Sequence, residues 1–196
     1  QARAQIFELR QLDLELAFVA ARSLSEDVEN QLTAVDDSHL KGGLEVVHHQ
    51  TVDDHFGRLV DALKLAASRS DLVVLTGGLG PTEDDCTRAA VEEAFHRPLG
   101  FRPALWTAIQ ARFRRSGTRM AARNRRQAYV PKGAAVLPNP NGTAPGFLLR
   151  EGGVAFVALP GPPREMQPMF LRHVLPRVRR RGDFEIWSGN SYGIPE

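Results

Sequence analysis

One stretch of the sequence decides the fold: Leu75-Thr76-Gly77-Gly78-Leu79-Gly80-Pro81-Thr82-Glu83-Asp84-Asp85-Cys86-Thr87. It joins an apolar segment to a glycine-rich turn, and a helix is expected to follow. Three glycines within four positions allow positive φ angles and remove the Cβ atoms that would keep a ligand away from the backbone amides. The N-terminus of the following helix favours an anion such as phosphate. The stretch therefore predicts a phosphate-binding turn with two carboxylates, Asp84 and Asp85, placed to hold a cation.

Two better-known phosphate-binding motifs do not fit this turn. A Walker loop places Gly-Lys-Ser/Thr after its glycines, and that combination does not occur here. A dinucleotide fingerprint needs a third small residue at the position of Glu83. A tight strand-to-helix turn without a ligand would explain one glycine and Pro81, but neither the three glycines nor the Asp pair. Thr82 and Asp85 resemble a capping box, which predicts that the helix begins here.

The segments on both sides of the turn predict alternating strands and helices. A strand is expected at 43–52, followed by a helix capped by Asp53 and by an apolar strand at 72–76. This order forms a βαβα unit, so the predicted fold class is α/β: a three-layer α/β/α, doubly wound, mostly parallel sheet. Ligands bind such sheets at the carboxyl ends of the strands, where the glycine turn lies.

Further elements are expected on either side of this unit. The helices are predicted at 24–32, 84–95, 103–115, 120–128 and from Pro162 or Pro163 toward residue 179. The strands are predicted at 6–9, 134–137, 147–149 and 154–159, the last two forming a hairpin turned at Glu151-Gly152-Gly153.

Length and composition are those of an ordinary globular protein. The 196 residues, 42% of them hydrophobic, are enough for one sizeable domain with a substantial core. No apolar run approaches the length of a membrane span and no leader is recognisable, so we expect a cytoplasmic protein without a membrane partner. The single cysteine, Cys86, excludes a disulfide within the chain and a cysteine-based metal site.

Arginines gather in two clusters, although the net charge is only +2. They are Arg112, Arg114, Arg115, Arg119, Arg123, Arg125 and Arg126, and then Arg177, Arg179, Arg180 and Arg181. Such clusters can bind nucleic acid phosphates. Because no nucleic-acid-binding fold is recognised in the sequence, a solvated helix face that also helps to hold an anionic ligand is the better interpretation. No nucleic acid partner is expected, and DNA binding is kept as a minor alternative.

The glycine turn resembles a known family. Residues 77–87 match the loop Gly-Gly-Leu-Gly-Pro-Thr-x-Asp-Asp-x-Thr of the molybdopterin-binding-like (MoCF) domain of the CinA family, competence/damage-inducible protein A. Two later segments resemble the same family: Asn139-Pro140-Asn141-Gly142-Thr143-Ala144-Pro145-Gly146-Phe147 and Leu159-Pro160-Gly161-Pro162-Pro163-Arg164-Glu165-Met166. Asn124 and Gln127 match its Asn-x-x-Gln pattern. We expect these segments to converge on one pocket at the carboxyl edge of the sheet.

The resemblance also divides the chain. Residues 43–183 correspond to the MoCF domain, and 184–196 resemble the start of the linker by which CinA proteins leave it. Because family members often continue into an amidohydrolase domain, the chain looks like a truncated or short form. Residues 1–42 diverge from the family, which opens with a strand and a Gly-Thr-Glu-Leu-Leu loop. The missing glycines are expected to weaken turnover, since the backbone approaches one side of the ligand less closely.

The resemblance implies a nucleotide pyrophosphatase that hydrolyses ADP-ribose or a similar nucleotide diphosphate. A divalent metal such as Mg²⁺ is implied, with potassium as a further ion. Asp84 and Asp85 are the expected catalytic residues and metal ligands. The expected ligand-binding residues are Thr76, Gly77, Gly78, Leu79, Gly80, Thr82, Thr87, Asn124, Gln127, Asn139, Gly142, Thr143, Ala144, Gly146, Pro160, Gly161 and Glu165.

Two other functions stay open. Related cofactor-synthesis domains use the same loop with an Asp aligned to Asp85, so the chain could be a binding module for molybdopterin or a nucleotide without turnover. An interaction domain in competence or the DNA-damage response is a weaker alternative. The family also implies a homo-oligomer.

Overall fold

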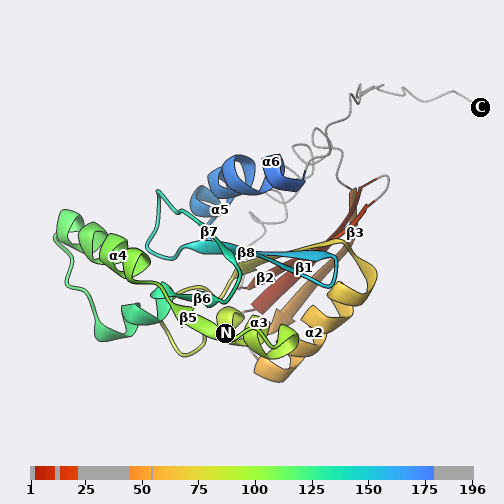
Figure 1. Ribbon diagram of the computed structural model, residues 1–196, viewed down its shortest axis with the longest axis horizontal. Helices are drawn as coiled ribbons and strands as arrows, with labels where there is room; N and C mark the ends of the chain where they lie inside the picture. The colour runs from red at the N-terminus through yellow and green to blue at the C-terminus, as the bar shows by residue number, and fades with distance from the viewer. Residues whose placement is uncertain (1–2, 12–13, 22–44, 54, 179–196) are drawn as a thin grey trace, which may run out of the picture.

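The computed structural model describes residues 3–11, 14–21, 45–53 and 55–178. Within them, a seven-stranded sheet has the order β3-β1-β2-β4-β9-β8-β7 (Figure 1). Its strands are β1 (Arg3–Gln11), β2 (Leu14–Ala21), β3 (Glu45–Asp53), β4 (Leu72–Gly77), β7 (Ala135–Leu137), β8 (Gly146–Glu151) and β9 (Val154–Leu159).

Five strands of this sheet run in one direction. β2 and β9 are parallel to β4, whereas β1 is antiparallel to both β2 and β3. β8 is antiparallel to its two neighbours, β7 and β9. β2, β3, β4, β7 and β9 therefore share a direction, and β1 and β8 oppose it.

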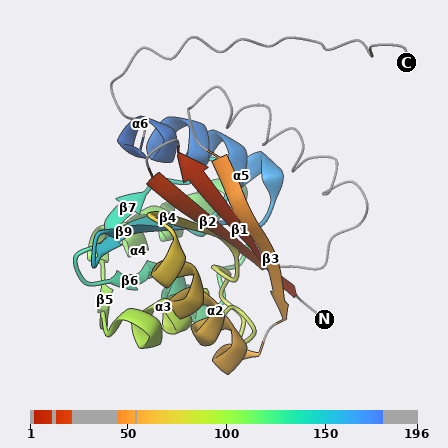
Figure 2. The ribbon, with the colours of Figure 1, turned by 90° about the vertical axis from the view of Figure 1, so that its right-hand side faces the viewer.

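β3 lies at the edge of the sheet (Figure 2). The predicted strand–helix–strand connection from β3 to β4 is present, and the two strands run the same way. They are not neighbours, because β2 pairs along β4 from Leu16↔Leu72 to Ala21↔Gly77 and β1 lies between β2 and β3. The strand predicted at 6–9 lies within β1, whereas the helix predicted at 24–32 and the linker at 184–196 lie outside the described residues.

Helices cover both faces of the sheet, as predicted for a three-layer α/β/α fold. α2 (Phe56–Arg69) and α3 (Thr87–Phe95) lie on one face, and α5 (Pro163–Met169), the π-helical turn η2 (Phe170–Val174) and α6 (Leu175–Val178) lie on the other (Figure 1). β4 alternates between the layers: Val73 and Leu75 pack with the α2–α3 core, whereas Leu72 and Val74 pack with the core under α5 and η2.

A separate arm projects beside the sheet. It consists of β5 (Leu99–Phe101), α4 (Pro103–Ser116), the 3₁₀ helix η1 (Ala122–Ala128) and β6 (Tyr129–Pro131). β5 and β6 pair as a second, two-stranded sheet that the sequence analysis did not predict. The Arg102 N–H donates to Ala128 O at 2.9 Å, and the Arg125 guanidinium lies 4.8 Å from the centre of the Phe101 ring. These contacts tie η1 to the start of α4.

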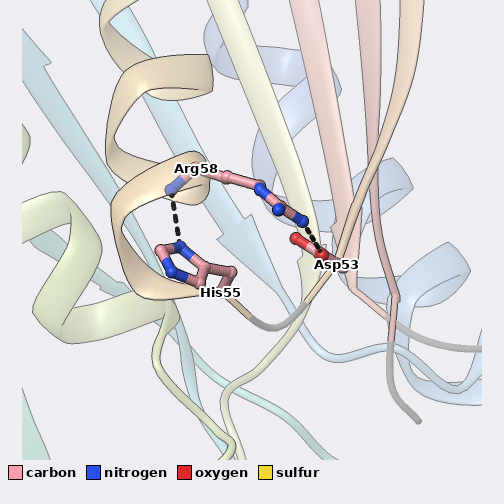
Figure 3. Close-up of polar contacts among 3 residues, drawn as sticks. All are labelled: Asp53, His55 and Arg58. Atoms are coloured by element: carbon pink, nitrogen blue, oxygen red, sulfur yellow. Dashed lines mark hydrogen bonds and ion pairs between the residues drawn. The ribbon is translucent and has the colours of Figure 1, made fainter.

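Asp53, the predicted cap of α2, does not cap the helix. The N-cap is His55, whose Nδ1 accepts from the Arg58 N–H at 3.4 Å, while the Asp53 carboxylate pairs with the Arg58 guanidinium (Figure 3). Asp53 is diverted because the long arginine side chain reaches back to it from the first turn.

The helix after the glycine loop begins at Thr87, three residues later than predicted. The Thr82 N–H and hydroxyl both donate to Asp85 Oδ2, at 2.8 and 2.5 Å, and Cys86 occupies the N-cap position. The Thr82–Asp85 pair therefore closes a turn ahead of the helix instead of capping it.

In the described part of the chain, no helix is long and apolar enough to cross a membrane.

Truncation of Leu63 should destabilise the fold much more than truncation of Leu65 in the same helix. Leu63 is fully buried, whereas Leu65 is 49% exposed. We expect Leu63→Ala to lower the free energy of unfolding by about 2–5 kcal/mol, because it leaves a cavity in the α2–α3 core. Leu65→Ala should change it by about 0.5 kcal/mol or less. Urea denaturation measures both, and equal losses would contradict this packing.

Candidate functional site

A cavity of about 400 Å³ lies at the carboxyl ends of the parallel neighbours β4 and β9. All three segments that were predicted to converge line it, together with one residue of η1. Its walls are Gly77, Gly78, Leu79, Gly80, Pro81, Thr82, Asp84, Asp85, Gln127, Thr143, Ala144, Pro160, Gly161, Pro162 and Glu165. The prediction of a single pocket at this edge of the sheet is confirmed.

The first two residues of α3 bind four successive carbonyls of the glycine loop. The Thr87 hydroxyl donates to Gly77 O at 2.9 Å, and the Thr87 N–H donates to Gly78 O at 3.3 Å. The Arg88 guanidinium donates to Leu79 O at 2.9 Å and to Gly80 O at 2.6 Å. The carbonyls of the loop are therefore turned toward the helix.

This arrangement turns the amides of the loop the other way. In a trans peptide the C=O and the next N–H point in opposite directions, and the described chain contains no cis peptide. The N–H groups of Gly78, Leu79 and Gly80 therefore point away from α3, and all three residues line the cavity. None of them is a donor in the loop and cap hydrogen bonds of the described residues. Successive free amides of this kind form a nest that binds anions.

Two of the glycines are required by close contacts. A Cβ on Gly78 would lie 2.2 Å from Thr87 Oγ1, and the φ of Gly78, +62°, already disfavours other residues. A Cβ on Gly80 would lie 2.3 Å from Asp85 Oδ2. A glycine at position 80 thus allows the Asp85 carboxylate to lie against the loop.

The two aspartates of the motif differ in their surroundings. Asp85 is half-buried, and its Oδ2 accepts both hydrogen bonds from Thr82. Asp84 is exposed at the cavity wall. Among the described residues, no group of three or more His, Cys, Asp or Glu side chains is arranged to hold a metal ion. The protein thus offers one fixed and one exposed carboxylate beside the amide nest.

The opposite wall is built on buried amide side chains. Gln127, 1% exposed, donates to Thr143 Oγ1 at 3.2 Å and accepts from Asn124 Nδ2 at 3.3 Å. Asn124 Oδ1 in turn accepts from the Ala121 N–H at 3.1 Å. This chain of hydrogen bonds fixes Thr143 in the wall and leaves its hydroxyl proton able to donate toward the cavity.

Asn139 organises the loop before β8 and does not line the cavity. Its Oδ1 accepts from the N–H groups of Asn141 and Gly142, and its Nδ2 donates to Ala144 O and to Glu165 Oε2. A Cβ on Gly142 would lie 1.8 Å from Glu165 Oε2, so the loop packs directly on that carboxylate. Glu165, in the first turn of α5, is buried and lines the cavity.

Comparison with known proteins identifies the family. Residues 22–180 match the family described as "Probable molybdopterin binding domain", which covers most of the chain. The chain belongs to this molybdopterin-binding domain family. Within it, the chain is similar to CinA-like proteins. It is 44% identical over 169 residues to a competence-damage inducible protein of Symbiobacterium thermophilum, covering 85% of this chain and 40% of that protein.

Other relatives point to the same group. The chain is 46% identical over 134 residues to a CinA-like protein of Dictyoglomus turgidum, covering 68% of this chain and 33% of that one. The crystal structure of CinA from Thermoplasma acidophilum, a protein with unknown function, superposes with a TM-score of 0.55 and 31% identity, covering 61% and 70% of the two chains. The chain spans less than half the length of these two curated relatives.

In this molybdopterin-binding domain, several predicted ligand-binding residues lie behind the cavity wall. Thirteen of the predicted site residues line the cavity, including both aspartates. The others are Thr76, Thr87, Asn124, Asn139, Gly142 and Gly146. The side chains of Thr87, Asn124 and Asn139 form hydrogen bonds with the backbone of the segments that build the cavity walls. Gly146 packs against the backbone of β9, and a Cβ at this position would lie 2.5 Å from Ala158 O.

Arg88 is the residue of the domain that the sequence analysis missed. It is 5% exposed, and burial lowers its pKa to about 10, opposed by the attraction of the Asp85 carboxylate. A cation in the first turn of a helix is unfavourable for the helix dipole. The position of an arginine in the first turn could have indicated from the sequence that Arg88 has partners outside its own helix. The structure shows that these partners are the loop carbonyls.

A larger, more open hollow of about 640 Å³ lies between β3 and α2. Asp53 and Arg58, two of its charged lining residues, pair with each other (Figure 3). None of its lining residues belongs to a family motif, so the smaller cavity is the candidate functional site.

Replacement of Arg88 should destabilise the glycine loop. Arg88→Met leaves Leu79 O and Gly80 O without their donors, and we expect unfolding to become easier by about 2–4 kcal/mol. The stability of Arg88→Lys should lie between those of the parent and Arg88→Met, because a single ammonium group cannot bridge two carbonyls as the forked guanidinium does. Urea denaturation measures both variants, with exposed Arg123→Met as the control, expected within about 0.5 kcal/mol. An Arg88→Met protein as stable as the parent would show that these bonds do not hold the loop.

Proposed function

We propose that this site hydrolyses the pyrophosphate bond of ADP-ribose or a similar nucleotide diphosphate. The observation that supports the proposal is the meeting of the glycine loop and two carboxylates in one cavity. The amides would bind the negatively charged oxygens of one phosphate, and they require no reorganisation because α3 already holds the loop. A full-length relative is more than twice as long, so the proposal concerns this domain alone.

The chain offers a residue to orient the attacking water. Asp85 is fixed by Thr82 through Oδ2, which leaves Oδ1 to accept a proton from water. The water oxygen would form a bond to one phosphorus, and the bridging oxygen would leave with the other phosphate. With ADP-ribose the products are AMP and ribose 5-phosphate, and the proton of the water passes through the carboxylate to solvent.

A divalent metal fits the donors that are present. Mg²⁺ is commonly bound by one or two carboxylates together with substrate phosphates, and Asp84 and Asp85 supply hard oxygen ligands at the cavity wall. The substrate would supply the ligands beyond this pair, since the described residues form no larger cluster. When bound, the ion would neutralise charge on the phosphates.

Thr143 is a better partner for the ligand's sugar or second phosphate than Asn139. Both were expected to bind the ligand, but the side-chain amide of Asn139 already bonds its own loop and Glu165. Thr143 lines the cavity and keeps a proton to donate.

The alternative is a binding module that holds molybdopterin without turnover. The family description supports it, because it names a molybdopterin binding domain. The amide nest would serve the phosphate of that ligand equally well.

Incubation with ADP-ribose separates the two functions. We expect AMP and ribose 5-phosphate to appear in the presence of Mg²⁺ and not in EDTA, detected by chromatography. Tight pterin binding without any release of AMP would replace the hydrolase by the binding module.

Asp85→Asn should separate catalysis from folding. Asn keeps the size and an acceptor for Thr82, so stability should change by about 1 kcal/mol, the worth of one hydrogen bond. Loss of the charge should lower the rate of AMP release on the order of a hundredfold or more. Asp84→Asn tests whether the exposed carboxylate shares this role.

Glu83→Gln is the matched control for both aspartate variants. Glu83 is exposed and does not line the cavity, so its replacement should leave the rate unchanged. An Asp85→Asn protein that folds normally and keeps the full rate would remove Asp85 from the mechanism.

A further inference from the structure

Arg126 reaches the glycine loop from η1, 44 residues further along the chain. Its Nη1 donates to Thr82 O at 3.2 Å. Thr82 lines the cavity, whereas Arg126 is exposed and contacts this wall residue without lining the cavity itself. A long, solvent-exposed cation therefore stands at the rim of the proposed phosphate site.

Within the described residues, no carboxylate pairs with the charge of Arg126. Among the described residues it forms no ion pair, and its one hydrogen bond goes to a neutral carbonyl. Asp85 Oδ2 is already bound by Thr82. Arg126 also lies close enough to Arg88 to help lower the pKa of that residue. Two guanidinium groups thus bind one loop, and an anion at the exposed Arg126 would offset their repulsion.

The other arginines of the arm are placed differently. Arg125 stacks on Phe101, and Arg112 donates to Pro140 O at 2.6 Å. Arg123 is exposed and has no hydrogen bond or ion pair with the part of the chain that the structure describes. Of the arm arginines, Arg126 is the one whose charge lowers the pKa of Arg88.

We propose that Arg126 binds a second phosphate next to the one held by the amides of Gly78, Leu79 and Gly80, and so makes the site select diphosphates over monophosphates. The proposal rests on the proposed function, because both phosphates belong to the same ligand. The nest offers donors for one phosphate, whereas a diphosphate presents a second anionic group. The planar fork of arginine pairs well with phosphate oxygens, and the weak bond to Thr82 O is readily exchanged for a charged partner.

The test is a comparison of ADP-ribose with AMP in EDTA, where the ligand is expected to stay intact. Dissociation constants are measured by calorimetry for the parent chain, Arg126→Gln and Arg123→Gln. We expect Arg126→Gln to weaken ADP-ribose binding about tenfold to a hundredfold, and AMP binding by less than about threefold. Arg123→Gln should change neither. The loss should also shrink as salt is raised, because exposed charges are screened.

A purely structural role for Arg126 predicts a different result. If the residue only pins the loop through Thr82 O, Arg126→Gln should weaken both ligands equally, and this outcome would overturn the proposal. If Arg123→Gln weakens ADP-ribose binding as much as Arg126→Gln does, the proposal is also overturned. The effect would then come from the overall positive charge of the arm and not from Arg126. If ADP-ribose binds with the expected pattern but is not hydrolysed with Mg²⁺, the assignment of Arg126 stands and the hydrolase proposal fails. A parent chain that binds neither ADP-ribose nor inorganic pyrophosphate would overturn both.

Discussion

The site depends on the hydrogen bonds that the first two residues of α3 donate to the glycine loop. Thr87 and Arg88 bind the carbonyls of residues 77 to 80, and the geometry of the trans peptide then turns three amides away from α3. An isolated glycine-rich loop would lose much entropy on ordering. Here the buried guanidinium is desolvated once, on folding, and the loop is ordered before any ligand arrives.

The sheet brings the remaining walls to this loop. β4 and β9 are parallel neighbours, so the residues after both strands meet at one edge. β8 runs antiparallel to β9, which places the loop before β8 at the same edge. That loop is in turn fixed by Asn139, Gln127 and Glu165, whose side chains bond to each other's segments. Hydrogen bonds therefore hold the cavity on both sides, and Arg126 of the arm contacts its wall at Thr82 O.

The sequence determined the class of the fold and the location of the site. Periodicity placed β4, α2, α4 and the β8–β9 hairpin to within a few residues, because these segments have strong apolar patterns or turn residues. The unbroken apolar run of β4 indicated helices on both faces, which the two cores confirm. Glycines and paired aspartates marked the loop, since few other structures require that combination.

Only the tertiary structure shows which residues of the motifs line the cavity and which hold the loops in place. Position in a motif does not show whether a polar side chain points into a cavity or back into its own loop, and Asn139 and Thr87 do the latter. The place of β3 at the sheet edge depends on strand pairing over long separations, which local patterns do not encode. Arg88 and Arg126 gain their importance from carbonyls 8 and 44 residues away, so only the folded chain brings them to the loop.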